Sequence, residues 1–188
     1  MKKRPLLLGI TGAFASGKST AAVFFVSKGF ARIELSSFLA QEIRQRSQEK
    51  ITRKHLQDEG NKMRAKYGAG ILAKKALEQI EQQKQERVVI DGIRNMSEVE
   101  ALCSNPNFLL LAVVSDRAVR FNRLQEHPRR EALDLQTFAK LDYRDLGIGE
   151  KDTGLQTGMC IALADVYIEN NGNIAEFEKK LAKYTTRH

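Results

Sequence analysis

A glycine-rich segment that ends in a lysine and a serine is the part of the chain best suited to chemistry. Residues 12–19 read G-A-F-A-S-G-K-S and satisfy the phosphate-binding pattern G-x-x-x-x-G-K-[ST]. Glycines let the backbone wrap closely around a polyphosphate, so that successive N–H groups converge on its oxygens at a helix N-terminus. Lys18 can then reach the β- and γ-phosphates, and the Ser19 hydroxyl suits Mg²⁺. The expected ligand is a nucleoside triphosphate, held by Gly12, Ala15, Ser16, Gly17, Lys18, Ser19 and Thr20.

The segments around this loop supply the strand and the helix that it needs. Residues 6–11 form a continuous apolar run, which is typical of a parallel strand covered on both faces. Residues 18–28 are compatible with a deeply buried helix, which Gly29 ends. Because a strand precedes the loop and a helix follows it, the pattern predicts a true phosphate site rather than an ordinary glycine-rich turn.

The remaining chain alternates apolar strands with amphipathic helices. The strand at 31–35 alternates apolar and charged residues, which predicts a place at or near a sheet edge, and Ser36 and Ser37 are expected to cap the helix after it. This alternation favours right-handed β-α-β crossovers and a parallel sheet of about five strands in a single domain, residues 1–188. The other expected strands are 88–91, 108–114 and 166–168, and the other expected helices are 36–48, 52–66, 71–85, 96–103, 115–126, 133–146, 159–164 and 175–183.

Composition narrows the class of protein further. Cys103 and Cys160 are the only cysteines and lie outside any metal-ligand spacing, so neither a disulfide framework nor a zinc site is indicated. The basic and apolar start, residues 1–8, mimics a signal peptide, but the phosphate loop follows it too soon for secretion. No apolar run approaches the roughly 20 residues of a membrane span. We therefore expect a soluble, cytoplasmic protein without a membrane partner.

The net charge of +8 is concentrated in two windows. Residues 41–66 contain eight Lys or Arg and four Asp or Glu, and residues 117–130 contain five and one, so each window carries +4. Basic patches are the electrostatic footprint of nucleic-acid binding, which is one interpretation. The others are solvated helix faces and the handling of phosphates by a small-molecule enzyme.

Several motifs together resemble the P-loop nucleotide kinases, of which nucleoside monophosphate kinases and dephospho-CoA kinases are the nearest. The phosphate loop, D-G-I-R at 91–94, the arginine-rich segment 117–130 and A-D-V-Y-I-E-N-N-G at 164–172 carry the likeness, in matching order over nearly the whole chain. The segment 52–68 is particularly similar to adenylate-kinase-related P-loop proteins of archaea and bacteria. The resemblance implies a three-layer α/β/α fold of the P-loop NTPase type with sheet order 2-3-1-4-5. It also implies an acceptor-binding helical insert at about 36–86 and a lid at about 124–150.

Both basic windows fall on these two inserts, so we prefer phosphoryl transfer to a small phosphate-bearing molecule over nucleic-acid binding. Phosphoryl transfer depends mostly on alignment and positive charge, so no histidine base is required. Asp91 is expected to hold the Mg²⁺ shell or to orient the acceptor, although it could also cap the following turn. Arg94 matches the arginine that grips the acceptor phosphate in the D-G-x-P-R motif of monophosphate kinases, with Ile93 in place of proline. Arg53 and Arg64 are further acceptor-binding candidates, or else solvated.

Arginines also mark the expected lid. Arg117, Arg120 and Arg123 recur at a spacing of three, which places them on neighbouring parts of one helix surface. By resemblance, Arg120 and Arg123 contact the nucleotide and the transferring phosphate, and Arg129 and Arg130 close over the γ-phosphate. Fork-like guanidinium groups suit phosphate oxygens. Asn170 and Asn171 correspond to a loop that packs near the adenine in these kinases, or form only a turn.

Other enzyme classes remain as alternatives. A regulatory GTPase is disfavoured because the N-K of Asn61 and Lys62 is not followed by the x-D of a guanine-reading segment. A dephospho-CoA kinase would explain residues 164–172, but its acidic D-A-D after the second strand is replaced here by Leu35-Ser36-Ser37. A polynucleotide kinase or RNA-associated ATPase is the alternative of a different class. The preferred function is an ATP- and Mg²⁺-dependent kinase of a nucleoside or deoxynucleoside monophosphate.

Overall fold

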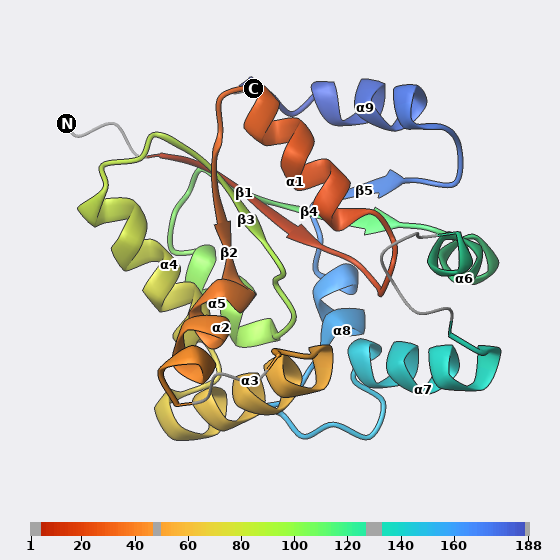
Figure 1. Ribbon diagram of the computed structural model, residues 1–188. Helices are drawn as coiled ribbons and strands as arrows, with labels where there is room; N and C mark the ends of the chain where they lie inside the picture. The colour runs from red at the N-terminus through yellow and green to blue at the C-terminus, as the bar shows by residue number, and fades with distance from the viewer. Residues whose placement is uncertain (1–4, 47–49, 127–132, 187–188) are drawn as a thin grey trace.

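A five-stranded sheet with helices on both faces forms the body of the molecule (Figure 1). The computed structural model describes residues 5–46, 50–126 and 133–186. The strands are β1 (Leu6–Thr11), β2 (Ala31–Glu34), β3 (Arg87–Asp91), β4 (Phe108–Val114) and β5 (Val166–Glu169). The helices are α1 (Lys18–Ser27), α2 (Leu35–Arg46), α3 (Arg53–Tyr67), α4 (Ile71–Gln82), α5 (Met96–Leu102), α6 (Arg117–Gln125), α7 (Leu135–Leu146), α8 (Thr157–Ala162) and α9 (Ile174–Ala182).

The sheet is parallel throughout and has the order β2-β3-β1-β4-β5, which confirms the predicted P-loop topology. The strand before the phosphate loop lies at its centre: Leu8 of β1 is opposite Val89 of β3 and Leu109 of β4. The prediction of an edge strand at 31–35 is also confirmed, since β2 stands at one end of this order. Carboxyl ends of parallel strands meet at one edge, so the ends of β1, β2 and β3 lie together there.

Two apolar layers cover the two faces of the sheet. On one face α1 and α9 pack on Leu8, Ile10 and Val113 through Phe25 and Phe177, all of which are buried. On the other face α4, α5 and α8 cover the sheet (Figure 1). This second layer joins buried residues of the strands to buried residues of the helices, among them Leu7, Ile33, Val88, Ile90, Leu110, Leu72, Ala76, Ile80, Val99, Leu102 and Cys160.

The start of the helix after β2 differs from the sequence prediction. The helix begins at Leu35, and the two serines that were expected to cap it lie within its first turn. Their hydroxyls donate to Glu34, the last residue of β2: Ser36 Oγ to the Glu34 carboxylate and Ser37 Oγ to the Glu34 carbonyl, each at 2.6 Å. Both serines lie inside the helix rather than just before it, so neither occupies the N-cap position and the capping prediction is wrong.

The connections after β2 and β4 carry the helices nearest the loop. Helices α2, α3 and α4 lie between β2 and β3, and α6 and α7 follow β4. A small apolar cluster of Phe14, Leu124 and Phe138 ties the phosphate loop to α6 and α7. In the described part of the chain, no helix has both the length and the apolar character needed to cross a membrane.

Candidate functional site

The backbone of residues 12–19 has the shape that the glycine pattern predicts. Gly12 and Gly17 have φ values of 146° and 106°, and Ala15 has a φ of 61°. A Cβ atom on Gly12 would lie 2.3 Å from the Val113 carbonyl oxygen, and one on Gly17 would lie 2.2 Å from the Asn170 amide nitrogen. Both motif glycines are therefore required by close packing as well as by backbone conformation.

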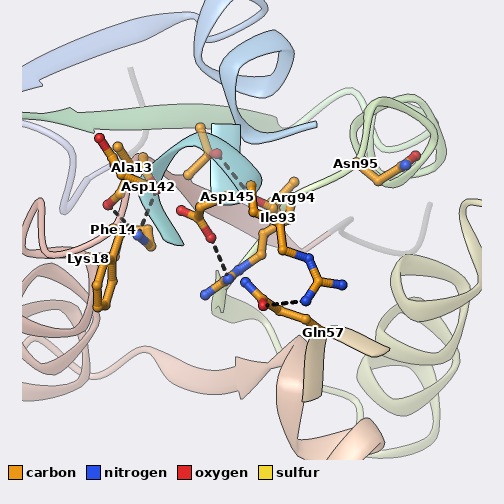
Figure 2. A network of polar contacts seen from close by, with 12 residues as sticks. Ala13, Phe14, Lys18, Gln57, Ile93, Arg94, Asn95, Asp142 and Asp145 are labelled. Carbon is orange, nitrogen blue, oxygen red and sulfur yellow. Dashed lines mark hydrogen bonds and ion pairs between the residues drawn. The ribbon is translucent and has the colours of Figure 1, made fainter. Parts of the chain in front are cut away.

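The loop carries several polar groups that a ligand could use. Helix α1 begins at Lys18 without a capping side chain, so its first N–H groups have no side-chain acceptor. The buried Ser16 hydroxyl has no hydrogen-bond partner among the described residues. Lys18 Nζ donates to the carbonyls of Gly12 at 2.6 Å and Ala13 at 2.8 Å, folding back over the loop (Figure 2). This donor set fits the oxygens of a polyphosphate.

A cavity of about 500 Å³ extends from this loop across to α2 and α3. The loop contributes Phe14 to Thr20, and three arginines from three other elements also line the cavity: Arg64, Arg94 and Arg123. Apolar side chains form much of the remaining wall. They are Leu35, Leu39, Ile51, Leu56, Leu72 and Leu155. One cavity thus combines a phosphate loop, several cations and an apolar region.

Two carboxylates stand at the carboxyl ends of neighbouring strands. Glu34 and Asp91 are register partners in β2 and β3, and Arg32 Nη2 lies 2.6 Å from Asp91 and 3.5 Å from Glu34. Glu34 is half-exposed and lines the cavity, whereas Asp91 is buried. Within the described ranges no group of three His, Cys, Asp or Glu could hold a metal. Ser19 and Glu34 line the cavity and carry the oxygen ligands that Mg²⁺ prefers, whereas Asp91 pairs with Arg32 and does not line it.

Arg64 and Arg94, both predicted to bind the acceptor, are held by buried carboxylates. Arg64 donates to one oxygen of Glu98 from Nε at 3.0 Å and from Nη2 at 2.7 Å. The other oxygen of Glu98 accepts from the backbone N–H groups of Arg94 at 2.9 Å and Asn95 at 3.2 Å. Arg94 Nη1 donates to Asp145 at 2.8 Å, as Figure 2 shows. Both guanidinium groups are fixed at the cavity wall before any ligand binds.

The arginines of α6 have two different roles: some hold the fold together and one lines the cavity. Arg120 is buried, donates to the Phe14 carbonyl at 3.0 Å and pairs with Asp142 of α7. It is not among the residues that line the cavity. Arg123 does line it, and donates to Ser115 Oγ at 3.0 Å and to the Asn170 carbonyl at 2.8 Å. Helix α6 therefore contributes one arginine, Arg123, to the cavity. Its other two arginines, Arg117 and Arg120, pair with Asp142 and anchor α7.

The asparagines after β5 support the phosphate loop. Asn170 is buried and donates from Nδ2 to the Ser16 carbonyl at 2.9 Å, and Asn171 Oδ1 accepts from the Asp116 N–H at 2.9 Å. Neither lines the cavity. The Arg53 side chain and the residues Arg129 and Arg130, all predicted to contact substrate or phosphate, lie outside the described residues.

A second polar network, which the sequence did not predict, joins α3 to α7. Arg144 donates to Glu150 at 2.7 Å, to Asp58 at 2.9 Å and to Gln57 Oε1 at 3.2 Å. The hydrogen bond from Arg144 lowers the pKa of Asp58 below its ordinary value. Burial by itself would raise the pKa of Glu150, but hydrogen bonds from Arg144 and Asn61 lower this pKa below its ordinary value. No local motif marks this network, because its members lie on three separate segments.

Removing Arg144 should destabilise the protein in a pH-dependent manner. A carboxyl group whose pKa is lowered on folding stabilises the folded protein at any pH above its unfolded pKa. The unfolded pKa values are 3.8 for Asp58 and 4.5 for Glu150. That stabilisation is lost as the pH falls through the lowered folded values. We expect Arg144→Met to melt below the wild-type protein at pH 7, with the difference shrinking once the pH falls below about 4. Lys140→Met, an exposed change on the same helix, is the control; a difference independent of pH would contradict the expectation.

Two known proteins are similar to this chain over most of its length. No protein-family model matches the chain. A UPF0200 protein of Methanothermobacter thermautotrophicus is 31% identical over 177 residues, covering 93% of this chain and 86% of its own. A UPF0200 protein of Sulfurisphaera tokodaii is 31% identical over 182 residues, covering 96% of both.

Solved structures show the same fold at low sequence identity. TT1252 from Thermus thermophilus superposes with a TM-score of 0.65 at 17% identity, covering 96% of both chains. Shikimate kinase from Bacteroides thetaiotaomicron gives a TM-score of 0.58 at 14% identity, covering 95% of both. The resemblance to P-loop kinases is thus confirmed for the fold. At 31% identity over nearly the full length of two relatives, the chain belongs to the UPF0200 family.

Proposed function

We propose that this protein is an ATP-dependent phosphotransferase whose acceptor is a small phosphate-bearing molecule, a nucleoside or deoxynucleoside monophosphate. The observation that carries the proposal is one cavity lined by both the phosphate loop and the guanidinium groups of Arg94 and Arg123; Arg64 lines it too, but its charge is matched by the buried Glu98. A donor and an acceptor that each bear phosphate need this combination of cations. The apolar part of the wall leaves room for the acceptor's remaining group.

Each residue has a distinct part in the proposed reaction. Bound ATP with Mg²⁺ supplies the γ-phosphoryl group and part of the neutralising charge. Lys18 and Arg123 stabilise the charge that develops on the transferring group, and Arg94, held by Asp145, orients the acceptor phosphate. Ser19 and Asp91 are the proposed metal-site residues. Arg120 and Asn170 maintain the shape of the loop through its carbonyls.

The surrounding segments complete the proposal. Residues 36–86 form the acceptor-binding insert and residues 124–150 the lid, in which Arg129 and Arg130 contact the γ-phosphate. Arg53 is a further proposed contact to the acceptor. The free thiols of Cys103 and Cys160 suit a reducing compartment, so the cytoplasm is the proposed location.

A hydroxyl acceptor, as in dephospho-CoA kinase, is the second candidate. Glu34 favours it, because this carboxylate lines the cavity and could accept the proton of a hydroxyl group. A phosphate acceptor is already ionised and needs no such base. No sequence motif marks Glu34; only its position at the end of a strand does.

A panel of acceptors tests the function directly. ADP release from ATP and Mg²⁺ is measured with each nucleoside and deoxynucleoside monophosphate, with dephospho-CoA and with a single-stranded RNA. We expect at least one monophosphate to raise ADP release well above the rate with ATP alone. Stimulation by dephospho-CoA only would favour the hydroxyl acceptor. Stimulation by RNA only, falling steeply with salt, would replace the proposal with an RNA-associated ATPase.

A variant at Arg94 tests whether this residue binds the acceptor or the donor. We expect Arg94→Ala to weaken use of the stimulating acceptor by roughly 2 to 4 kcal/mol in kcat/KM, because a charge-assisted contact to phosphate is lost. The affinity for ATP should hardly change. Arg44→Ala, an exposed change on α2 outside this cavity, is the matched control. An equal loss of ATP binding would place Arg94 on the donor side.

A further inference from the structure

Helix α3 carries two buried polar side chains on one face of the cavity. Gln57 and Arg64 are seven residues apart, which is close to two helical turns, so they lie on the same side of α3. Only 4% of Gln57 and 3% of Arg64 is exposed, and both line the cavity. Long polar side chains are rarely buried to this degree without a full set of partners.

Both side chains have unmet donors and no unmet acceptor. The Gln57 carbonyl oxygen accepts from Arg144, which orients the amide, and the Nε2 donor has no partner among the described residues. Figure 2 shows Gln57 in the same view as the Arg94–Asp145 pair. Arg64 uses Nε and Nη2 on Glu98, while Nη1 has no partner in the described part of the chain. Leaving a buried donor unpaired is unfavourable, so a ligand that supplies acceptors here is favoured.

The electrostatic balance of this wall points to a neutral ligand group. The charge of Arg64 is already matched by the fully buried Glu98, and Arg144 behind Gln57 is matched by Asp58 and Glu150. A second anion would therefore meet no excess positive charge here. A carbonyl oxygen requires none, and it accepts hydrogen bonds from amide and guanidinium N–H groups alike.

The apolar neighbours limit the shape of that group. Leu39, Leu56, Leu72 and Leu155 line the same cavity and offer no partner for the hydroxyls of a sugar or polyol. A flat ring buries its faces against such side chains and exposes polar atoms only at its edge. An oxo group can accept from both unmet donors, whereas an amino group at the same position is itself a donor and leaves only the neighbouring ring nitrogen as an acceptor.

We infer that the far end of the acceptor is a nucleobase with an exocyclic oxo group, which is selected over its amino counterpart by the unmet donors of Gln57 and Arg64. This inference rests on the proposed function, and deepens it by naming the class of monophosphate. Gln57 acts here as a specificity-determining residue, and Arg144 and Glu98 act as positioning residues.

Two matched pairs of nucleotides test the inference by calorimetric titration. Inosine and adenosine monophosphates differ at the C6 position of a purine, as uridine and cytidine monophosphates differ at C4 of a pyrimidine. At least one pair should bind. Within that pair we expect the oxo nucleotide to bind at least about tenfold more tightly than the amino nucleotide, because it gains a buried hydrogen bond from an otherwise unpaired donor. This comparison uses the unmodified protein.

A variant identifies the residue responsible. Gln57→Met keeps the length of the side chain without the amide, and should bring the affinity ratio close to one by weakening the oxo member. Gln82→Met, an exposed change on α4, should leave the ratio as it is. Three results would overturn the inference while the proposed function stands. They are equal affinities in the unmodified protein, tighter binding of the amino member, and an equal loss of affinity for both members in Gln57→Met. If no monophosphate binds at all, the proposed function fails with it.

Discussion

Replacing Lys18 by alanine should lower the rate of phosphoryl transfer by about a hundredfold or more and leave the fold intact. Lys18 Nζ stands at the phosphate loop, where it donates to the carbonyls of Gly12 and Ala13. A triphosphate offers stronger acceptors to the same ammonium group, which then stabilises the charge that develops during transfer. The Lys18 side chain contributes little to the apolar core, so its removal should not unfold the protein.

The measurement is ADP release with the best acceptor of the panel, accompanied by thermal melting. Lys74→Ala, an exposed change on α4, serves as the control and should retain full activity. Unchanged ADP release in Lys18→Ala would rule out the kinase proposal, because no other lysine in the described part of the chain lines the cavity.

Glu98→Ala should destabilise the protein far more than the loss of an exposed carboxylate. Glu98 is fully buried, receives two hydrogen bonds from Arg64 and caps the backbone at Arg94 and Asn95. Its loss would leave a buried guanidinium charge without its partner. Breaking such a pair costs about 3–5 kcal/mol, which corresponds to a fall in melting temperature of roughly 6–20 °C in a domain of this size.

A matched control and a double variant make this expectation specific. Glu100→Ala removes an exposed carboxylate from the same helix and should change the melting temperature little. Replacing Arg64 and Glu98 together by methionine should recover much of the lost stability, because no uncompensated charge remains. If the double variant is as unstable as the sum of Arg64→Met and Glu98→Met, the ion pair is not the source of the effect.

Local pattern predicted the phosphate loop and most of the fold because both depend on short-range features. Gly12 and Gly17 are needed for backbone conformation and close approach, and the period of apolar residues marks strands and helices with small errors at their ends. The order of the strands followed from resemblance. The predicted cap at Ser36 was wrong because the helix begins one residue earlier, at Leu35, which places the serine inside the first turn.

The roles of individual polar residues depend on elements far away in the sequence. A spacing of three placed Arg120 and Arg123 on one basic surface, but Asp142 of α7 and the Phe14 carbonyl draw Arg120 into the interior. Glu98, Gln57 and Arg144 carry no motif at all. Their partners come from hydrogen bonds between α3 and the distant helices α5 and α7, which are not visible in any local window.

The central position of β1 has a consequence for synthesis on the ribosome. Leu6 pairs with Arg87, 81 residues later, and β4 on its other side comes later still. At about 5–20 residues per second, this apolar strand emerges roughly 4–16 s before its first sheet neighbour is complete. Until then Leu7, Leu8 and Ile10 lack the strands that flank them, so the nascent chain offers a binding site for a chaperone. Slowing translation should therefore lower the yield of folded protein, and the loss should be greatest when the delay falls before codon 87.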